Sequence, residues 1–166
     1  MQGYNELMCS ENGGKGSICG VILAGGKSRR MGREKALLRI QGLPLAARLA
    51  QLLASVTDEI VISCSGNGAA LESLGYPVIQ DLFPGQGPLA GLHAAIHHTQ
   101  RPLVLLLACD LPCLHADLLR GLIDASAGFD AVVPQTAGGR FIRSARFTGA
   151  PAQNPPKSDC VAEKTK

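Results

Sequence analysis

The sequence predicts an α/β fold of three layers, in which helices cover both faces of a mostly parallel, Rossmann-like sheet. Two observations support this fold class. Short runs that are apolar at every position alternate along the chain with segments whose apolar residues recur at helical spacing. Continuous apolar runs are typical of strands buried on both faces, which requires helices on both sides of the sheet.

Each element is placed from its local pattern. The predicted strands are residues 21–23, 60–62, 78–79, 103–107 and 131–133. The first predicted helix follows Pro44 and carries a stripe of Leu45, Leu49, Leu52 and Leu53. The second follows Pro88 with Leu89, Leu92 and Ile96, and the third carries Leu118, Leu119, Leu122 and Ile123. A weaker helix is predicted over residues 69–74.

The length of 166 residues fits one domain. We assign this domain to residues 18–140, where the predicted strands and helices alternate. Residues 1–17 are polar and contain several glycines, so we expect a disordered leader. Residues 141–166 contain prolines and lack periodicity, so we expect a disordered or truncated tail, and a truncation would impair activity.

Charge and composition exclude several classes of protein. The net charge of +3 is too small for a general nucleic-acid binder. No apolar run approaches the ~18 to 20 residues of a membrane span. The six cysteines contain no C-x-x-C pair, which disfavours a zinc site and is consistent with reduced thiols in a cytoplasmic protein. His93 and His97 are four residues apart on a predicted helix, and we interpret them as a surface pair.

Residues 18–38 carry the most information about function. Their sequence, ICGVILAGGKSRRMGREKALL, runs from an apolar strand into glycines and then into several cations. Amides of a glycine turn can point together at anionic oxygens while Lys and Arg neutralise the remaining charge, so this segment predicts a triphosphate site. It is not a Walker A loop, because Val21 stands where that loop needs a glycine. It is not the dinucleotide fingerprint either, because Gly25, Gly26 and Gly32 are spaced differently.

The run LAGGKSRRMGREKALL resembles the signature of nucleotidyltransferases, in particular the molybdenum cofactor guanylyltransferase family. The later strings CDLP and GPLAG are similar to further motifs of that family, and the resemblance covers about residues 18–140. It implies a nucleotidyltransferase fold of the nucleotide-diphospho-sugar transferase type. The implied reaction transfers GMP from GTP to molybdopterin with Mg²⁺ as cofactor and releases pyrophosphate. Besides GTP and molybdopterin, the implied partners are molybdenum-insertion proteins and molybdoenzyme chaperones, with neither nucleic acid nor membrane.

Two charged residues are candidates for the chemistry. Asp110 closes the most hydrophobic strand, where its carboxylate suits Mg²⁺, although it could also cap the next helix or bind loop amides. Lys35 follows the glycine turn, where its ammonium would stabilise charge on the α and β phosphates. The alternative for Lys35 is a solvated surface lysine, but the family's lysine in this motif binds nucleotide.

Further nucleotide contacts are expected near the ends of the same strands. The candidates around the glycine turn are Leu23, Ala24, Gly25 and Gly26, together with Arg29 and Arg30 unless these are solvated or paired with Glu34. Asp81 matches a nucleotide-binding aspartate of the family, and its carboxylate could bind a guanine edge or a ribose, or cap the following turn. Ser63 is a further candidate that departs from the family, which has asparagine at this position; Asn67 follows four residues later.

These candidates predict one shared site. The predicted strand ends are followed by residues 24–35, 63–68, 81–87 and 109–112. Ligands of such sheets bind beyond the carboxyl ends of the strands, so we expect these four loops to meet in one crevice. Two other functions would suit the same crevice: a cytidylyl- or sugar-phosphate nucleotidyltransferase, or a non-catalytic nucleotide-binding adaptor in cofactor delivery.

Overall fold

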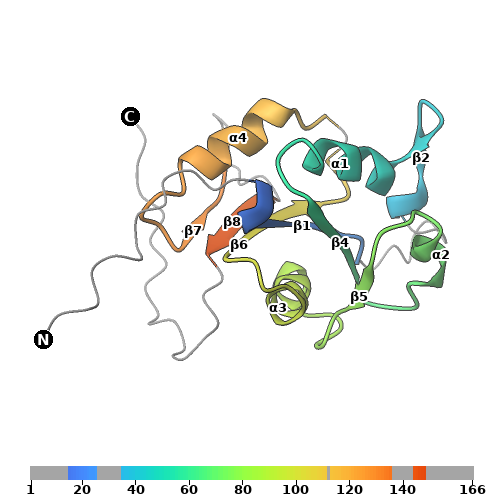
Figure 1. Cartoon of the computed structure of the whole chain (residues 1–166). Helices are drawn as coiled ribbons and strands as arrows, with labels where there is room; N and C mark the ends of the chain where they lie inside the picture. Colours follow the sequence, from blue (N-terminus) through green and yellow to red (C-terminus); the bar gives the residue numbers. More distant parts are fainter. Residues whose placement is uncertain (1–14, 26–34, 112, 136–143, 149–166) are drawn as a thin grey trace, which may run out of the picture.

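The computed structural model describes residues 15–25, 35–111, 113–135 and 144–148 (Figure 1). The strands are β1 Ile18–Leu23, β2 Arg39–Ile40, β3 Leu43–Pro44, β4 Glu59–Cys64, β5 Val78–Gln80, β6 Leu103–Ala108, β7 Ala131–Val132 and β8 Ser144–Thr148. The helices are α1 Leu45–Leu53, α2 Ala69–Glu72, α3 Pro88–His98 and α4 Ala116–Asp124, and the 3-10 turns are η1 Lys15–Ser17 and η2 Lys35–Leu37. All predicted strands and helices are therefore present.

The main sheet has the strand order β5-β4-β1-β6-β8-β7. Strands β5, β4, β1 and β6 run parallel, and β8 pairs antiparallel with both β6 and β7. The chain moves from β1 outwards to β4 and β5, and then crosses to the other side of β1 to form β6. This reversal makes the gap between the carboxyl ends of β1 and β6 a topological switch point, where open α/β sheets bind ligands.

Helices pack on both faces of this sheet, which confirms the three-layer α/β fold. Alternate residues of a strand point to opposite faces. Ile18 and Ile22 of β1 belong to a core cluster that includes residues of α1 and α4, whereas Val21 belongs to a second cluster with Leu92 of α3. Figure 1 shows α1 and α4 on one side of the sheet and α3 on the other.

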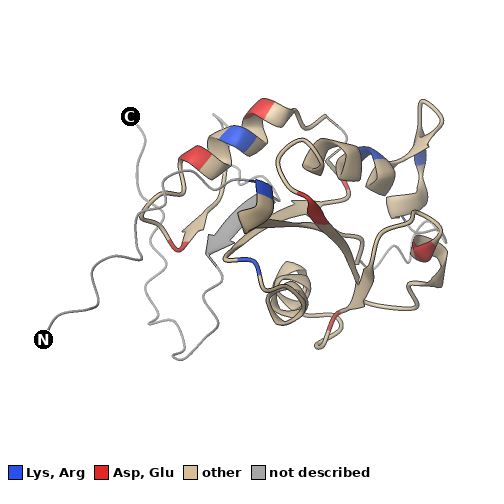
Figure 2. Cartoon of the chain, viewed as in Figure 1, with Lys and Arg blue, Asp and Glu red and all other residues tan. Residues whose placement is uncertain are grey.

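Charged residues are excluded from the two central strands. The sequences of β1 and β6 contain none, and every residue of β1 is buried. Figure 2 shows charged positions on the helices α1 and α4, on the strands β2 and β4, and on connecting segments instead. In the part of the chain that the structure describes, no helix is both long and apolar enough to cross a bilayer.

The predicted apolar stripe of α3 is wrong. Leu89 is 68% exposed and Ile96 is 36% exposed, so of the three residues only Leu92 is buried. The buried face of α3 consists mainly of small residues, including Ala90, Gly91, Ala94 and Ala95. Small side chains let the helix backbone approach the sheet closely, and a search for large apolar residues at helical spacing does not detect such a face.

Strand β8 lies within the segment that the sequence assigned to the tail. Its five residues pair with β6, from Thr148 opposite Leu103 to Ser144 opposite Leu107. These residues therefore belong to the sheet, and our assignment of them to a disordered or truncated tail is wrong. The segment SARFT has little local signal, and its strand arises from pairing with the strongly apolar β6. Residues 1–14, 136–143 and 149–166 lie outside the described residues, and the expectations of a disordered leader and tail stay predictions there.

Candidate active site

A cavity of about 440 Å³ opens at the carboxyl ends of the parallel strands. Its lining combines the segments that follow β1, β4, β5 and β6, so the predicted meeting of four loops is confirmed. The lining residues are Leu23, Ala24, Gly25, Lys35, Ser63, Ser65, Asp81, Gly85, Gly87, Pro88, Gly91, Ala108, Cys109 and Asp110. The cavity includes the ends of β1 and β6, and it therefore lies at the switch point of the sheet.

Backbone hydrogen bonds fix the turn after β1 between its two neighbouring strands. The Ala24 amide donates to the Ser63 carbonyl at 2.8 Å, and the Cys109 amide donates to the Leu23 carbonyl at 3.2 Å. A Cβ atom added at Gly25 would lie 2.9 Å from Oγ of Ser65, closer than real Cβ atoms approach. Glycine at this position therefore allows the polar side chains of the next loop to come close to the turn.

Asp110 lies just beyond the carboxyl end of β6, where the chain leaves the buried core. Its neighbours Ala108 and Cys109 are buried, whereas Asp110 is exposed and lines the cavity. The N-cap of α4 is His115, so Asp110 does not occupy the capping position considered from the sequence. Its carboxylate therefore lies at the edge of the cavity, where the chain leaves the core.

Lys35 begins η2 and is exposed. Its carbonyl accepts a hydrogen bond from the amide of Leu38 at 3.1 Å, which anchors the backbone on which the ammonium is carried. Of the described residues that line the cavity, Lys35 is the one with a positive charge, and it shares the cavity with the carboxylates of Asp81 and Asp110. The predicted site residues Gly26, Arg29 and Arg30 fall on residues 26–34, outside the described residues, although both flanking residues, Gly25 and Lys35, line the cavity.

Asp81 and Ser63 meet across the ends of β5 and β4. The Ser63 hydroxyl donates a hydrogen bond of 2.5 Å to Oδ1 of Asp81. Both residues line the cavity, as do Leu23, Ala24 and Gly25. Asn67 instead accepts a hydrogen bond from the amide of Ala69 at 3.0 Å, at the start of α2. The structure therefore brings together every predicted site residue that it describes.

Sequence reasoning missed several lining residues. Ser65 and Cys109 belong to loops that were predicted to matter, but neither residue type carries a distinguishing signal. Gly87 and Pro88 lie at the start of α3, which directs the positive end of its helix dipole towards this edge of the sheet. The string GPLAG marked this helix start, but the contact of Gly91 with the cavity depends on the fold.

The histidine pair lies outside the cavity lining. The Nε2 atoms of His93 and His97 are 3.1 Å apart, and the ring of Phe83 packs edge-on against His93 with a centroid distance of 5.2 Å. Within the described ranges no group of three potential metal-ligating side chains occurs. His97 is exposed, whereas His93 is half-buried with its Nδ1 atom buried, so only His97 fits the predicted surface pair.

The fold and the site define a class of protein. A doubly wound sheet carries a glycine turn, a lysine and two carboxylates around one cavity at its switch point, as expected for a nucleotide-binding enzyme of the nucleotidyltransferase type. Residues 20–158 match the family model described as the MobA-like NTP transferase domain. The chain therefore belongs to the MobA-like NTP transferase family, whose members are nucleotidyltransferases.

Curated relatives and a solved structure agree with this membership. A protein of Pelotomaculum thermopropionicum named "Probable molybdenum cofactor guanylyltransferase" is 43% identical over 116 residues, which cover 70% of this chain and 56% of that protein. The molybdenum cofactor guanylyltransferase of Pseudomonas aeruginosa is 39% identical over 110 residues, covering 64% and 54%. The crystal structure of molybdopterin-guanine dinucleotide biosynthesis protein A from Archaeoglobus fulgidus matches with a TM-score of 0.61 and 26% identity, covering 78% of this chain and 67% of that one. The chain spans little more than half the length of these curated relatives.

Proposed function

We propose that this protein transfers GMP from GTP to molybdopterin and releases pyrophosphate, in the biosynthesis of the molybdenum cofactor. The observation that carries this proposal is the meeting of Gly25, Lys35 and Asp110 in one cavity, because the three come from segments separated by up to about 85 residues of sequence. The family and the names of its relatives support guanylyl transfer in particular. We also propose a cytoplasmic location.

In the proposed reaction the terminal phosphate of molybdopterin attacks the α phosphate of GTP in line. The bond between the α and β phosphates breaks, and the β and γ phosphates leave as pyrophosphate. Backbone amides of the turn at Gly25 and Gly26 would bind phosphate oxygens, and the Lys35 ammonium would neutralise charge that develops on the leaving group. The sequence offers no local signature of a covalent intermediate, so the role of these residues is to hold the reacting phosphates in position.

The site suits Mg²⁺ through Asp110. Magnesium is usually held by one or two carboxylates together with substrate phosphates and water, so one exposed carboxylate at the cavity edge is sufficient on the protein side. Asp110 fits this requirement because it is exposed and lines the same cavity as Lys35. When bound there, the ion would polarise phosphate oxygens and neutralise negative charge.

The two carboxylates of the cavity follow different strands of the sheet. Asp110 follows β6 and Asp81 follows β5, and these strands are three spacings apart in the order β5-β4-β1-β6. At about 4.8 Å a spacing, the two strand ends are about 14 Å apart. We assign the triphosphate and the metal to Asp110 and the nucleoside to Asp81.

The test of this proposal is pyrophosphate release with molybdopterin as acceptor and GTP, CTP or UTP as donor. We expect turnover with GTP, and we expect Asp110→Asn to lower it by about 100-fold or more. The matched control is Asp124→Asn, which neutralises an exposed aspartate on α4 outside the cavity lining and should leave turnover unchanged. Preference for CTP or UTP would indicate another nucleotidyltransferase, and GTP binding without pyrophosphate release would indicate an adaptor.

A further inference from the structure

A side-chain hydrogen bond joins two neighbouring strands inside the cavity. The hydroxyl of Ser63, the fifth residue of β4, donates to Oδ1 of Asp81, which directly follows β5. The bond length of 2.5 Å lies at the short end of the range for a hydroxyl that donates to a carboxylate. Ser63 is only 1% exposed, whereas Asp81 is half-buried, so the bond leads from the core to the cavity surface.

The backbone holds both residues in place. The carbonyl of Ser63 accepts from the amide of Ala24, and the amide of Asp81 donates to the carbonyl of Cys64 at 2.9 Å. Ser63 also pairs in register with Leu23 of β1 and with Ile79 of β5. The hydroxyl and the carboxylate are therefore carried by ordered strand ends and not by a free loop.

Helix α3 restricts the space around the Ser63 side chain. A Cβ atom added at Gly91 would lie 2.7 Å from Oγ of Ser63 and 2.4 Å from Cδ2 of Leu23, so the helix backbone packs directly against these side chains. The second carboxylate oxygen, Oδ2 of Asp81, would lie 3.4 Å from a Cβ atom added at Gly25. One oxygen of Asp81 is thus held by Ser63, and the other faces the turn after β1.

We propose that Ser63 is a positioning residue for Asp81, and that it orients the carboxylate to accept a pair of hydrogen bonds from the nucleoside part of the substrate. The inference rests on the proposed function. Asp81 follows β5 and Asp110 follows β6, at the two ends of the strand order β5-β4-β1-β6. Fixing one oxygen in advance reduces the rotamer freedom that the carboxylate loses when the nucleotide binds.

Two parts of a guanosine nucleotide present a suitable pair of donors. Guanine offers its N1–H and its 2-amino group, and ribose offers its 2′- and 3′-hydroxyls. The two sources are separated by comparing GTP with inosine triphosphate, which lacks the 2-amino group, and with 2′-deoxy-GTP. In the parent protein one of these analogues should bind about tenfold more weakly than GTP, because the loss of one hydrogen bond to a charged group has an effect of this size.

The variant Ser63→Ala tests the positioning role by calorimetric titration with the three nucleotides. We expect GTP to bind about tenfold more weakly, and we expect the discrimination against the affected analogue to decrease. In an Asp81→Ala background the same Ser63→Ala change should alter GTP affinity by less than about twofold, because Ser63 acts through Asp81. Ser126→Ala is the matched control, since it removes another buried hydroxyl, one that donates to the Ile123 carbonyl at the end of α4.

The outcomes separate this inference from the proposed function. If the parent binds GTP but Ser63→Ala has the same effect with and without Asp81, or has no effect, the positioning role is wrong and the proposed function stands. If the parent discriminates against neither analogue, the role is also wrong. If the parent binds no nucleotide, the proposed function fails and the inference fails with it. If Ser63→Ala does not fold, Ser63→Cys provides a second variant, which keeps a polar group at the position but replaces the hydroxyl with a weaker and larger donor, and the same results are expected of it.

Discussion

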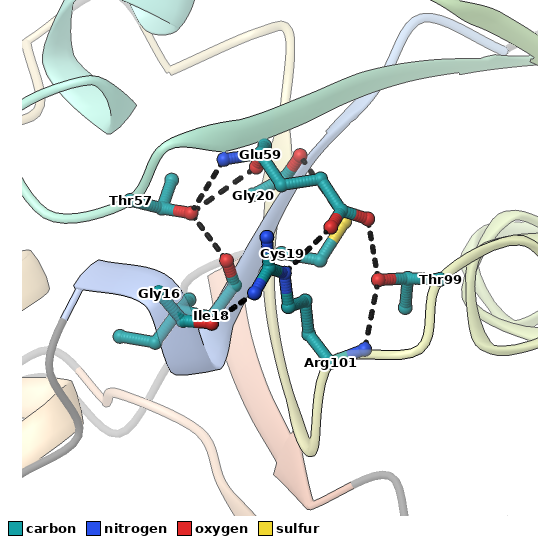
Figure 3. Close-up of polar contacts among 8 residues, drawn as sticks. All are labelled: Gly16, Ile18, Cys19, Gly20, Thr57, Glu59, Thr99 and Arg101. Carbon is teal, nitrogen blue, oxygen red and sulfur yellow. Dashed lines mark hydrogen bonds and ion pairs between the residues drawn. The ribbon is translucent and has the colours of Figure 1, made fainter.

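The two ends of the parallel sheet differ in what their polar side chains contact. At the amino ends, Glu59 of β4 and Arg101 before β6 form an ion pair of 2.8 Å, and Thr99 donates to the same carboxylate (Figure 3). At the carboxyl ends, Lys35, Asp81 and Asp110 line a cavity large enough for a ligand. Polar groups at the amino ends bind one another, whereas those at the carboxyl ends, including the bonded pair Ser63 and Asp81, also line a cavity where a substrate can bind.

The network at the amino ends also binds the backbone. The Arg101 guanidinium donates to the Gly16 carbonyl, and the Thr57 hydroxyl donates to the Ile18 carbonyl. Burial raises the pKa of the neighbouring Cys19 thiol to about 12, and the nearby carboxylate of Glu59 acts in the same direction. The comparison indicates that this end of the sheet contributes stability and the cavity end contributes binding. Substitutions at the two ends should therefore affect different measurements.

The largest expected effect is on activity at the cavity end. Lys35→Ala should lower kcat/KM for GTP by about 100-fold or more, because it removes the cation that we assign to the leaving phosphates. Its melting temperature should stay close to that of the parent, since Lys35 is exposed. The matched control is Lys15→Ala, an exposed lysine at the other end of the sheet, whose ammonium donates to the Ala54 carbonyl at 3.3 Å. Equal kinetic losses in the two variants would contradict the assignment of function to the cavity end.

The next effect is on stability at the amino ends. Glu59→Ala should lower the free energy of unfolding by about 1–3 kcal/mol, because it removes the carboxylate that accepts hydrogen bonds from Arg101 and Thr99. Nucleotide affinity should not change. Urea unfolding measures the first quantity and calorimetric titration the second. For comparison, Asp117→Asn removes the exposed pair of Asp117 with Arg120 and should cost less than about 1 kcal/mol.

The same network predicts a dependence of stability on pH. Burial favours a higher pKa for Glu59, but the hydrogen bonds from Thr99 and Arg101 outweigh it, so the pKa lies below its ordinary value. The ionised form therefore stabilises the fold above the unfolded-state pKa of about 4.3, and this contribution is lost as the pH falls through the lower folded-state pKa. We expect the stability difference between the parent and Glu59→Gln to narrow from pH 6 to pH 3. A difference that is constant over this range would rule out the ionised carboxylate as its source.

The smallest effect is expected for an exposed apolar residue near the cavity. Leu89 of α3 is 68% exposed, so Leu89→Ser should change the free energy of unfolding by no more than about 0.5 kcal/mol. Leu92→Ala, on the buried face of the same helix, should cost about 2–5 kcal/mol. Chemical denaturation of the two variants checks the orientation of α3. A large loss for Leu89→Ser would restore the apolar stripe that the sequence predicted.

The fold was predictable where burial leaves a local signal. Strands β1 and β6 are apolar at nearly every position because helices cover both of their faces, and this pattern can be read without coordinates. The position of helix α3 was predicted correctly but its buried face was not, because the helix packs on the sheet through Gly91 and alanines. Strand β8 was not predicted, because it forms through pairing with β6, which is about 40 residues away in sequence.

The site was predictable where a residue type matches a ligand. Lys35, Asp81 and Asp110 stand at predicted strand or loop positions, and the rule for switch points correctly placed them around one cavity. The bond between Ser63 and Asp81 was not predictable, because it depends on the pairing of β4 with β5. The contact of Gly91 with Ser63 likewise depends on how α3 crosses the sheet.

The role of Asp110 as an anchor for the metal is tested by the effect of Mg²⁺ on GTP binding to the parent and to Asp110→Asn. If Asp110 anchors the metal beside the triphosphate, Mg²⁺ should tighten GTP binding to the parent by about tenfold or more, and this enhancement should be lost in Asp110→Asn. Asp124→Asn should retain the parent's enhancement. The same enhancement in Asp110→Asn as in the parent would show that Asp110 does not anchor the metal.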